Sequence, residues 1–256
     1  MIKKGMNIVV DKKIAWVVGV NQGIGAEIMQ RLISDGIHVV GIDKSKENIP
    51  NELQEFSHIC DIRDDGQVNQ ICQNLLRSSP PDYFIHVAGV LHMGGHEEIS
   101  PEKWRETFAV NLFSPFYFLQ HLSPYFKAKM SGNVVVISSN AAHVPRMYMS
   151  AYGASKAALT YFTKTVALEL ASYGVRVNVI SPGSTATPMQ YQLWKDSQGE
   201  QHTILGNLGQ FKVGIPLKKI AKVKDIANSV MFLISDQASH ITMHDLVIDG
   251  GATLGC

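Results

Sequence analysis

The sequence predicts an α/β protein built on one doubly wound parallel sheet, because short apolar runs alternate with longer amphipathic stretches. No linker rich in Pro, Gly or Ser and no internal repeat divides the 256 residues, so residues 1–256 are expected to form a single domain. Right-handed crossovers between neighbouring parallel strands then give a Rossmann-like fold.

The elements of this fold follow from the apolar runs and from the stretches between them. Strands are expected at residues 14–20, 39–43, 59–62, 83–87, 134–138, 175–181 and 246–249. Helices are expected at residues 24–34, 67–77, 101–129, 151–172 and 223–235. Such an alternation predicts βαβ units with helices on both faces of the sheet.

The composition excludes several classes of function. Hydrophobic residues make up 45% and charged residues 18% of the chain, which is a globular balance. The formal net charge is +1 without any basic or acidic run, so we expect neither nucleic acid nor a membrane as a partner. Residues 1–13 hold no apolar run long enough for a signal peptide. Cys60, Cys72 and Cys256 lack metal-type spacing and cannot all pair, which favours a reducing, cytoplasmic setting.

A glycine-rich turn follows the first expected strand and opens the first helix. Gly19, Gly23 and Gly25 would let the backbone approach a pyrophosphate, while the helix that begins near Ile24 offers free N–H groups. An ordinary turn is the alternative interpretation. Strand–turn–helix context favours the dinucleotide site.

Asp43 ends the second expected strand, where a ribose-binding acid belongs. Its carboxylate would accept hydrogen bonds from the ribose hydroxyls and repel a 2′-phosphate, which favours NAD over NADP. A helix-capping or surface role for Asp43 stays open. Lys44 and Lys46 weaken the case, because basic residues can serve a 2′-phosphate.

Tyr152 and Lys156 are spaced four residues apart and therefore share one face of a helix. An ammonium group near a phenol favours the phenolate and lowers its pKa, so such a tyrosine could exchange a proton with an alcohol near neutral pH. For this pair alone, an ordinary half-exposed helix pair is the better interpretation. Ser139, with twelve residues between it and Tyr152, and Asn111 change that balance.

These features occur in the same order in the short-chain dehydrogenases/reductases, which the chain resembles along nearly its whole length. The resemblance implies that Tyr152 is the general base and that Lys156 lowers its pKa and binds the nicotinamide ribose. It implies that Ser139 orients the substrate oxygen and that Asn111 holds a water linking Lys156 to solvent. Ser138 could be confused with Ser139, but the twelve-residue gap favours Ser139.

The same resemblance implies further cofactor contacts and two departures. The implied contacts beyond the glycine turn and Asp43 are Asp61 and Ile62 beside the adenine, Ala88, Gly89, Pro182, Gly183 and, at the carboxamide, Thr187. Val18 stands where a Thr is common, and His86-Val87 where the family has Asn-Asn or Asn-Ala. We expect apolar packing at Val18 and Val87 to replace the polar tie between these strands.

The substrate is indicated by segments that are similar to one branch of the family, at residues 89–94, 141–147, 181–194, 211–217 and 238–255. This branch oxidises 2,3-dihydro-2,3-dihydroxybenzoate to 2,3-dihydroxybenzoate with NAD in catecholate siderophore biosynthesis. A small, flat, anionic dihydrodiol needs an apolar slot and a cationic anchor. Beside Ser139, the residues expected to bind it are Leu91, Met93, Arg146, Met189 and Gln190.

Other interpretations stay open. The substrate could be a different alcohol or a 3-oxoacyl thioester, although no basic patch for a phosphorylated carrier is evident. A non-catalytic dinucleotide sensor would be expected to lack Tyr152 or Lys156, and both are present. His92 and His96 have a helical ligand spacing, but Gly94 and Gly95 favour a loop, so no metal is expected.

The helix expected at residues 151–172 carries apolar residues around much of its circumference. One sheet face cannot cover all of that surface, which suggests contact with a second subunit. The family resemblance implies a homotetramer arranged as a dimer of dimers.

Overall fold

Seven parallel strands form the central sheet of the computed structural model, which describes residues 12–255. The strand order is β3-β2-β1-β4-β5-β6-β7, so the chain builds outward from β1 in one direction and then in the other. The strands are β1 (Ile14–Val18), β2 (His38–Asp43), β3 (Ser57–Ile59), β4 (Tyr83–His86), β5 (Gly132–Ile137), β6 (Val175–Pro182) and β7 (Asp245–Ile248). Cys256 and most of the N-terminal stretch discussed above lie outside the described residues.

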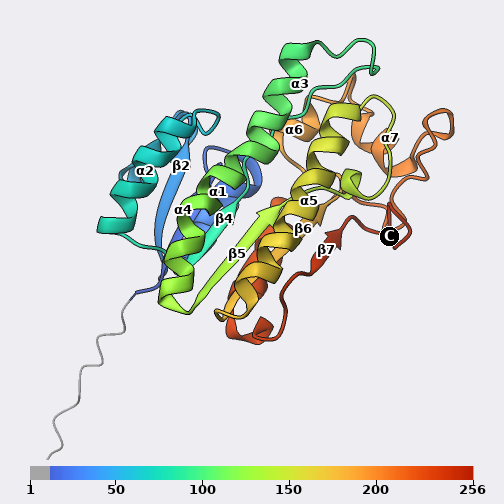
Figure 1. Cartoon of the computed structure of the whole chain (residues 1–256). Helices are drawn as coiled ribbons and strands as arrows, with labels where there is room; N and C mark the ends of the chain where they lie inside the picture. The colour runs from blue at the N-terminus through green and yellow to red at the C-terminus, as the bar shows by residue number, and fades with distance from the viewer. Residues whose placement is uncertain (1–11, 256) are drawn as a thin grey trace, which may run out of the picture.

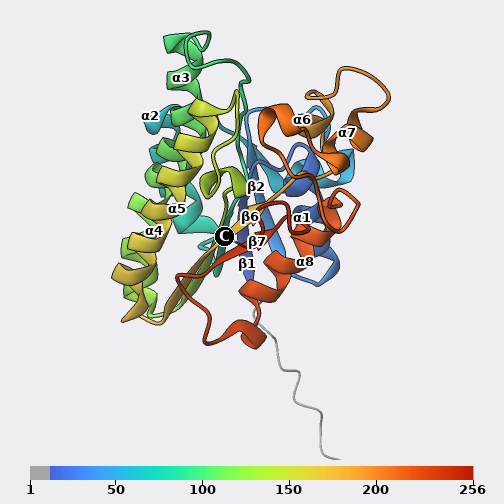
Figure 2. The same ribbon diagram turned by 90° about the vertical axis from the view of Figure 1, so that its right-hand side faces the viewer.

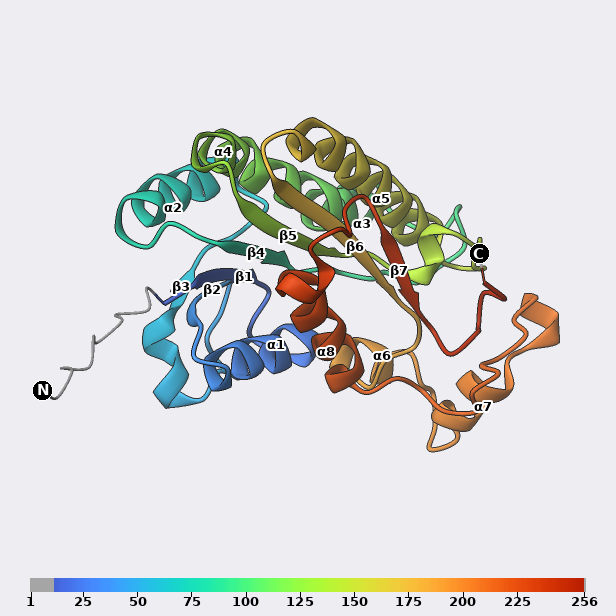
Figure 3. The ribbon, with the colours of Figure 1, turned by 90° about the horizontal axis from the view of Figure 1, so that it is seen from below.

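Helices cover both faces of the sheet, with α2, α4 and α5 on one side and α1 and α8 on the other (Figure 3). These helices are α1 (Gly23–Ser34), α2 (Asp65–Ser78), α4 (Ser114–Lys129), α5 (Ser150–Ala171) and α8 (Val223–Ile234). Trp16 and Val18 of β1 pack in the core beneath α2, α4 and α5, whereas Ala15 and Val17 pack in the core beneath α1 and α8. Because alternate residues enter two apolar cores, the strands read as continuous apolar runs. The predicted α/β fold class is confirmed.

Two predicted elements differ from the structure. The third strand occupies Ser57–Ile59 instead of residues 59–62. It lies at the edge of the sheet, where Ile59 is 68% exposed, so the strand does not need a buried apolar run. The apolar pattern therefore marked the residues that leave the sheet. The long helix expected at residues 101–129 consists of α3 (Pro101–Phe108), a π-helical turn η2 (Ala109–Phe113) and α4.

The carboxyl ends of the strands point to one edge of the sheet, where α3, α6 and α7 project (Figures 1 and 2). The sequence analysis missed α6 (Pro188–Tyr191) and α7 (Gly199–Leu205), which are too short to show helical periodicity. We call residues 188–215, which include both helices, the covering segment. Short 3₁₀ turns complete the chain at η1 (Asn51–Phe56), η3 (Asn140–Ala142), η4 (Leu208–Gln210) and η5 (Asp236–Ala238). Within residues 12–255, no helix combines the length and apolar character needed to cross a membrane.

Candidate active site

A cavity of about 1240 Å³ opens at this carboxyl edge, between the strand ends and the covering segment. It brings together almost every residue that the sequence singled out. These lining residues are Gly19, Gly23, Ile24, Asp43, Asp61, Ile62, Ala88, Gly89, Leu91, Met93, Ser139, Arg146, Tyr152, Lys156, Pro182, Gly183, Thr187, Met189 and Gln190. Gly25 and Asn111 do not line the cavity. Each lies directly behind the lining, Gly25 against Gly19 and Asn111 against Val90.

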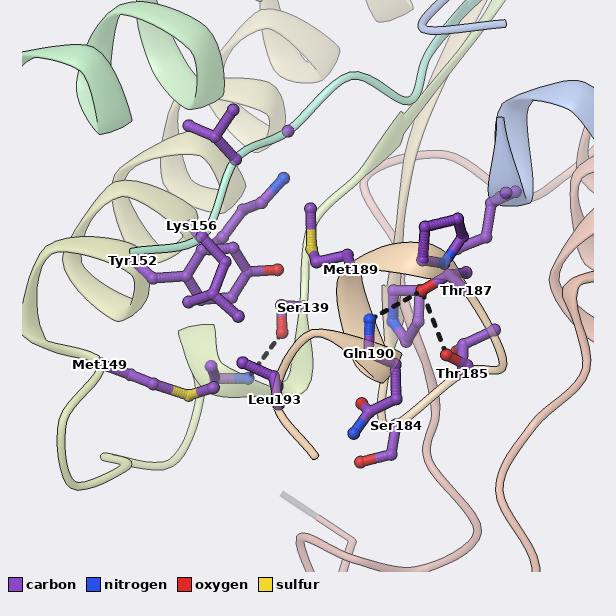
Figure 4. A pocket seen from close by; sticks show the side chains of 18 of the residues that line it. Ser139, Met149, Tyr152, Lys156, Ser184, Thr185, Thr187, Met189, Gln190 and Leu193 are labelled. Carbon is purple, nitrogen blue, oxygen red and sulfur yellow. Dashed lines mark hydrogen bonds between the residues drawn. The ribbon is translucent and has the colours of Figure 1, made fainter. Parts of the chain in front are cut away.

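Tyr152 and Lys156 reach the cavity from the first turns of α5, and Ser139 reaches it from the end of β5 (Figure 4). The Lys156 ammonium nitrogen lies 5.9 Å from the centroid of the Tyr152 ring and donates to the Ile137 carbonyl at 2.8 Å. In Figure 4 the Tyr152 and Ser139 side chains extend into the same space, with Met189 opposite. An alcohol placed there would meet both hydroxyl groups.

The pKa values of this pair correct one expectation. Burial raises the pKa of Tyr152, and the Ser139 hydroxyl beside it acts in the opposite direction. Burial also lowers the pKa of Lys156 to about 7. The sequence predicted that Lys156 would lower the Tyr152 pKa, but burial disfavours both charged forms and dominates in the protein alone. Tyr152 is therefore a neutral phenol here, beside an amine that can gain or lose a proton near pH 7.

The π-helical turn η2 directs Asn111 toward the back of this site. The Asn111 amide oxygen accepts the Val90 N–H at 2.9 Å, and its nitrogen donates to the Ser155 hydroxyl at 2.9 Å. A Cβ added at Gly89 would lie 3.4 Å from both the Asn111 amide oxygen and the Lys156 ammonium nitrogen. Asn111 thus fixes the chain that follows β4 next to Lys156, and the extra residue of a π turn is a common device at functional sites.

Ser138 and Ser139 are separated by their hydrogen bonds. The Ser138 hydroxyl donates to the Lys156 carbonyl at 3.1 Å and lies 2.8 Å from the Thr160 hydroxyl, so it joins β5 to α5. The Ser139 hydroxyl accepts the Ala141 N–H at 3.1 Å and remains beside Tyr152. The choice of Ser139 from its spacing agrees with this geometry.

The glycine turn has the shape that a dinucleotide needs. Gly19 has φ +94°, and a Cβ there would lie 2.6 Å from the Ala88 nitrogen. A Cβ at Gly25 would lie 1.8 Å from the Gly19 carbonyl oxygen, so the turn can fold back only without side chains. The backbone is thereby left open at the N-terminus of α1, where a pyrophosphate binds in such folds.

The acidic residues at this end of the cavity are partly engaged. One Asp43 oxygen accepts the Asn21 N–H at 2.9 Å, which leaves its other oxygen for a ligand. Asp61 pairs with the Arg63 guanidinium, whose Nη2 lies 2.6 Å from Oδ2, and this contact holds the Asp61 pKa low. Arg63 also lies 3.4 Å from Glu106. The sequence analysis did not include Arg63, which carries no motif of its own.

His86 is fully buried behind Lys156, at the end of β4. Burial, and then the positive charge of Lys156, lower the His86 pKa to about 3, so the ring is neutral. Its Nε2 lies 2.7 Å from the Ser114 hydroxyl, which itself donates to the Val110 carbonyl. Val18 is fully buried, as the expected apolar packing requires. Its carbonyl also joins β1 to the chain after β4, because it accepts the backbone N–H groups of Val87 and Ala88.

Residues after β6 lead into the covering segment. Thr187 caps α6: its hydroxyl accepts the Gln190 N–H and donates to the Thr185 carbonyl, both at 3.2 Å (Figure 4). The hydroxyl predicted to bind a carboxamide therefore already has two local partners. Leu193, which the sequence analysis did not single out, also lines the cavity. Met149 lines it as well.

Trp194 gives the covering segment a small core of its own. Its indole nitrogen lies 3.2 Å from the Thr203 hydroxyl, and its ring centroid lies 5.0 Å from that of Tyr191. A Cβ at Gly199 would lie 2.2 Å from Trp194 Cγ, so α7 begins directly against the indole ring. The two short helices are held together by this tryptophan.

The loop after β5 is tied to the C-terminal segment. Asn140 donates to Asp249 at 3.2 Å, and the Arg146 Nη2 donates to the Ala252 carbonyl at 3.4 Å. His143 Nε2 lies 3.0 Å from an oxygen of the buried Asp245. These contacts hold a half-buried Arg146 at the cavity, in contrast to a solvated loop arginine.

The two histidines weighed as metal ligands have separate partners. His92 lies 3.0 Å from Glu106, whereas the exposed His96 lies 3.0 Å from Glu97. The segment between them is not helical. Within the described part of the chain, no group of three or more His, Cys, Asp or Glu side chains could hold a metal ion.

This fold and these site residues are those of the short-chain dehydrogenases/reductases, and the chain belongs to that family. A family model described as enoyl-(acyl carrier protein) reductase matches residues 19–253. The solved structure of 4-hydroxyisoleucine dehydrogenase complexed with NADH superposes with a TM-score of 0.87, at 26% identity, over 96% of this chain and 100% of that one.

More similar relatives narrow the comparison. The chain is 44% identical to 2,3-dihydro-2,3-dihydroxybenzoate dehydrogenase of Bacillus subtilis (strain 168), over 96% of this chain and 98% of the relative. It is 45% identical to the enzyme of the same name from Escherichia coli (strain K12), over 95% of this chain and 98% of the relative. A 3-oxoacyl-[acyl-carrier-protein] reductase of Buchnera aphidicola subsp. Schizaphis graminum (strain Sg) is 31% identical, over 94% of this chain and 98% of the relative.

Proposed function

We propose that this protein catalyses the NAD-dependent oxidation of 2,3-dihydro-2,3-dihydroxybenzoate to 2,3-dihydroxybenzoate. The observation that carries the proposal is one cavity holding Ser139, Tyr152 and Lys156 in a chain 44% and 45% identical to two dehydrogenases of that name. The cavity volume of about 1240 Å³ exceeds that of an ordinary small-molecule pocket, so a dinucleotide and a small acid fit together.

The proposed chemistry assigns one task to each residue. Ser139 holds the substrate hydroxyl. Tyr152 gives up its phenolic proton toward the neutral Lys156 amine and takes the proton of the substrate hydroxyl in its place. Lys156, with a pKa of about 7, passes the phenolic proton on while Asn111 keeps the neighbouring backbone in place. When bound by these residues, NAD would supply the acceptor for the hydride that leaves the substrate carbon. The ring ketone that forms tautomerises to an aromatic catechol, which makes the oxidative direction strongly favourable.

NAD is the cofactor we propose, in contact with the glycine turn, Asp43 and the other residues assigned to it from the sequence. Support comes from the backbone opening at Gly19 and Gly25, which side chains would close. A carboxylate at Asp43 that keeps one oxygen available favours ribose hydroxyls and disfavours a 2′-phosphate.

The substrate is expected to lie flat between apolar side chains. The apolar side chains that line the cavity include Leu91, Met93, Met149, Met189 and Leu193. Arg146 supplies a planar pair of donors for the carboxylate, and Gln190 supplies a neutral polar contact. A slot of this kind with one anion site suits the dihydrodiol acid better than a long acyl thioester.

We further propose a homotetramer, a role in catecholate siderophore biosynthesis and a cytoplasmic location, with the chain forming one domain. Tyr161 and Leu168 of α5 are 78% and 66% exposed, which supports a subunit contact there. Free thiols at Cys60 and Cys72 suit a reducing compartment. Light scattering at micromolar concentration is expected to give four times the mass of the chain, and a monomer would contradict the tetramer.

The decisive experiment follows NADH absorbance with the dihydrodiol acid, with neutral cyclic alcohols and, in reverse, with a 3-oxoacyl thioester. We expect the acid to be oxidised with the highest kcat/KM by at least about 100-fold, since it alone satisfies the charged anchor. Faster turnover of the thioester would replace the proposal by the reductase function of the 31% identical relative.

A further inference from the structure

Residues 204–215 of the covering segment, which we call the tongue, form a hairpin with a fixed stem. Asn207 and Lys212 exchange two backbone hydrogen bonds, at 2.9 and 3.0 Å, and the Ile215 N–H donates to the Ile204 carbonyl at 2.8 Å. A Cβ on Gly206 or on Gly214 would lie 2.4 Å from the opposite backbone. The two sides of the stem thus leave no room for a side chain at either glycine.

The tongue distributes its side chains in an unusual way. Leu208 and Phe211 at its tip are 90% and 86% exposed. Lys212, the charged residue beside them, is half-buried and lines the cavity instead. Apolar groups usually occupy the buried positions and ammonium groups the solvent, because desolvating a charge is unfavourable. Turning Lys212 inward therefore calls for a compensating group inside the cavity.

A second cation lines the same cavity as Lys212. Arg146 lines the same cavity from the loop after β5 and is close enough to lower the Lys212 pKa, in addition to the larger effect of burial. Among the described residues, no ion pair includes either side chain. Two cations that line one cavity without an ion-pair partner favour the binding of an anion there.

The carboxylates that line the cavity do not serve as that anion. They are Asp43, Asp61, Glu106 and Asp196. Asp61 and Glu106 contact Arg63, and Asp43 is bound by the glycine turn. Asp196 accepts the Gln198 N–H at 2.9 Å within its own turn. Among the described residues, the lining therefore offers no free carboxylate to these two cations, which favours an anionic ligand.

We propose that Lys212 is a specificity-determining residue that binds the substrate carboxylate together with Arg146, each cation from a different wall of the cavity. This inference rests on the proposed function, because it assigns the carboxylate of that substrate. Arg146 provides paired donors, whereas Lys212 provides a point charge carried by the tongue. The anion then also links the tongue to the loop after β5, so that a neutral diol is bound less well.

The test compares Lys212→Gln with Lys219→Gln, a matched change of an exposed lysine that does not line the cavity. We expect Lys212→Gln to raise the KM for the dihydrodiol acid about fivefold to tenfold, and Lys212→Arg to restore most of it. Calorimetric titration of the NAD-loaded protein with 2,3-dihydroxybenzoate should show the same loss of affinity. The KM for a neutral cyclohexadiene diol and the Kd for NAD should stay unchanged.

The outcomes separate this inference from the proposed function. If the wild-type protein does not oxidise the acid, the proposed function fails. If it does, and Lys212→Gln leaves both the KM and the product affinity unchanged, only the role of Lys212 is wrong. A weakened Kd for NAD in Lys212→Gln, with the affinity for the acid retained, would overturn the inference by assigning the lysine to a cofactor phosphate.

Discussion

The two walls of the cavity are built differently. On the side of the sheet, Asn111, Ser138 and Lys156 are buried and hydrogen-bonded to backbone or to each other, around the half-buried Tyr152. On the opposite side, the covering segment has a small core at Trp194 and exposes Leu205, Leu208 and Phe211 to solvent. The first wall is part of the protein core, whereas the second is a separate small unit laid over it.

This difference suggests a division of work. Groups that transfer a proton must be held within a fraction of an ångström, which a packed and hydrogen-bonded core provides. Groups that select a substrate need only supply charge and shape. We therefore expect changes on the sheet side to alter kcat, and changes on the covering side and its facing loop to alter KM.

The largest expected effect comes from Tyr152→Phe, which keeps the ring and removes the oxygen that takes the proton. Turnover should fall by at least about 100-fold, while NAD affinity stays nearly constant. Steady-state NADH formation and a direct NAD titration check the two parts. Near-normal turnover would show that the sheet-side wall does not carry the chemistry through this residue.

A second prediction concerns the stability of the same wall. His86 has a folded pKa of about 3 against an ordinary value of 6.5, so between these values only the unfolded chain takes up its proton. Stability is unaffected above pH 6.5 and falls progressively below it, by about 2 kcal/mol at pH 5 from this group. His86→Asn should remove that part of the acid sensitivity in urea unfolding measured from pH 8 to pH 5. The exposed His96→Asn should change nothing, and an unaltered pH dependence in His86→Asn would contradict the neutral buried ring.

Arg146→Ala tests whether the covering side and its facing loop control KM and leave kcat unchanged. The KM for the dihydrodiol acid should rise about tenfold, since a charged hydrogen bond is lost, whereas kcat should change little. Arg146→Lys should recover only part of this, because a point charge cannot make paired contacts. A neutral cyclic diol serves as the control substrate. A fall in kcat with constant KM would place Arg146 among the catalytic groups and break the comparison.

The smallest effect is expected for Asp43→Ala. This change should weaken the binding of NAD several-fold and reduce the preference of the protein for NAD over NADP. Both cofactors are compared at saturating substrate, with Lys44→Ala as the neighbouring control. Equal wild-type activity with NAD and NADP would mean that Lys44 or Lys46 dominates over the Asp43 carboxylate.

What the sequence could predict depended on whether local spacing decides the structure. Tyr152 and Lys156 share a helix face because four residues make one turn, and Gly19 follows a strand because the apolar run stops there. The pKa of Lys156 and the pairing of Asp61 with Arg63 depend on what the fold packs beside them, so no spacing reveals them. The helices of the covering segment were not predicted, because the four-residue α6 and the seven-residue α7 are too short to show a helical period in the sequence.

The position of Trp194 makes the covering segment visible to fluorescence. Of the three tryptophans, Trp16 is completely buried in β1 and Trp104 is 42% exposed on α3, while Trp194 lines the cavity. Indole emission overlaps the absorption of a reduced nicotinamide, so energy transfer would quench Trp194 whenever NADH occupies the cavity. The share of quenching that is lost in Trp194→Phe would then record the arrival and departure of NADH without any added dye.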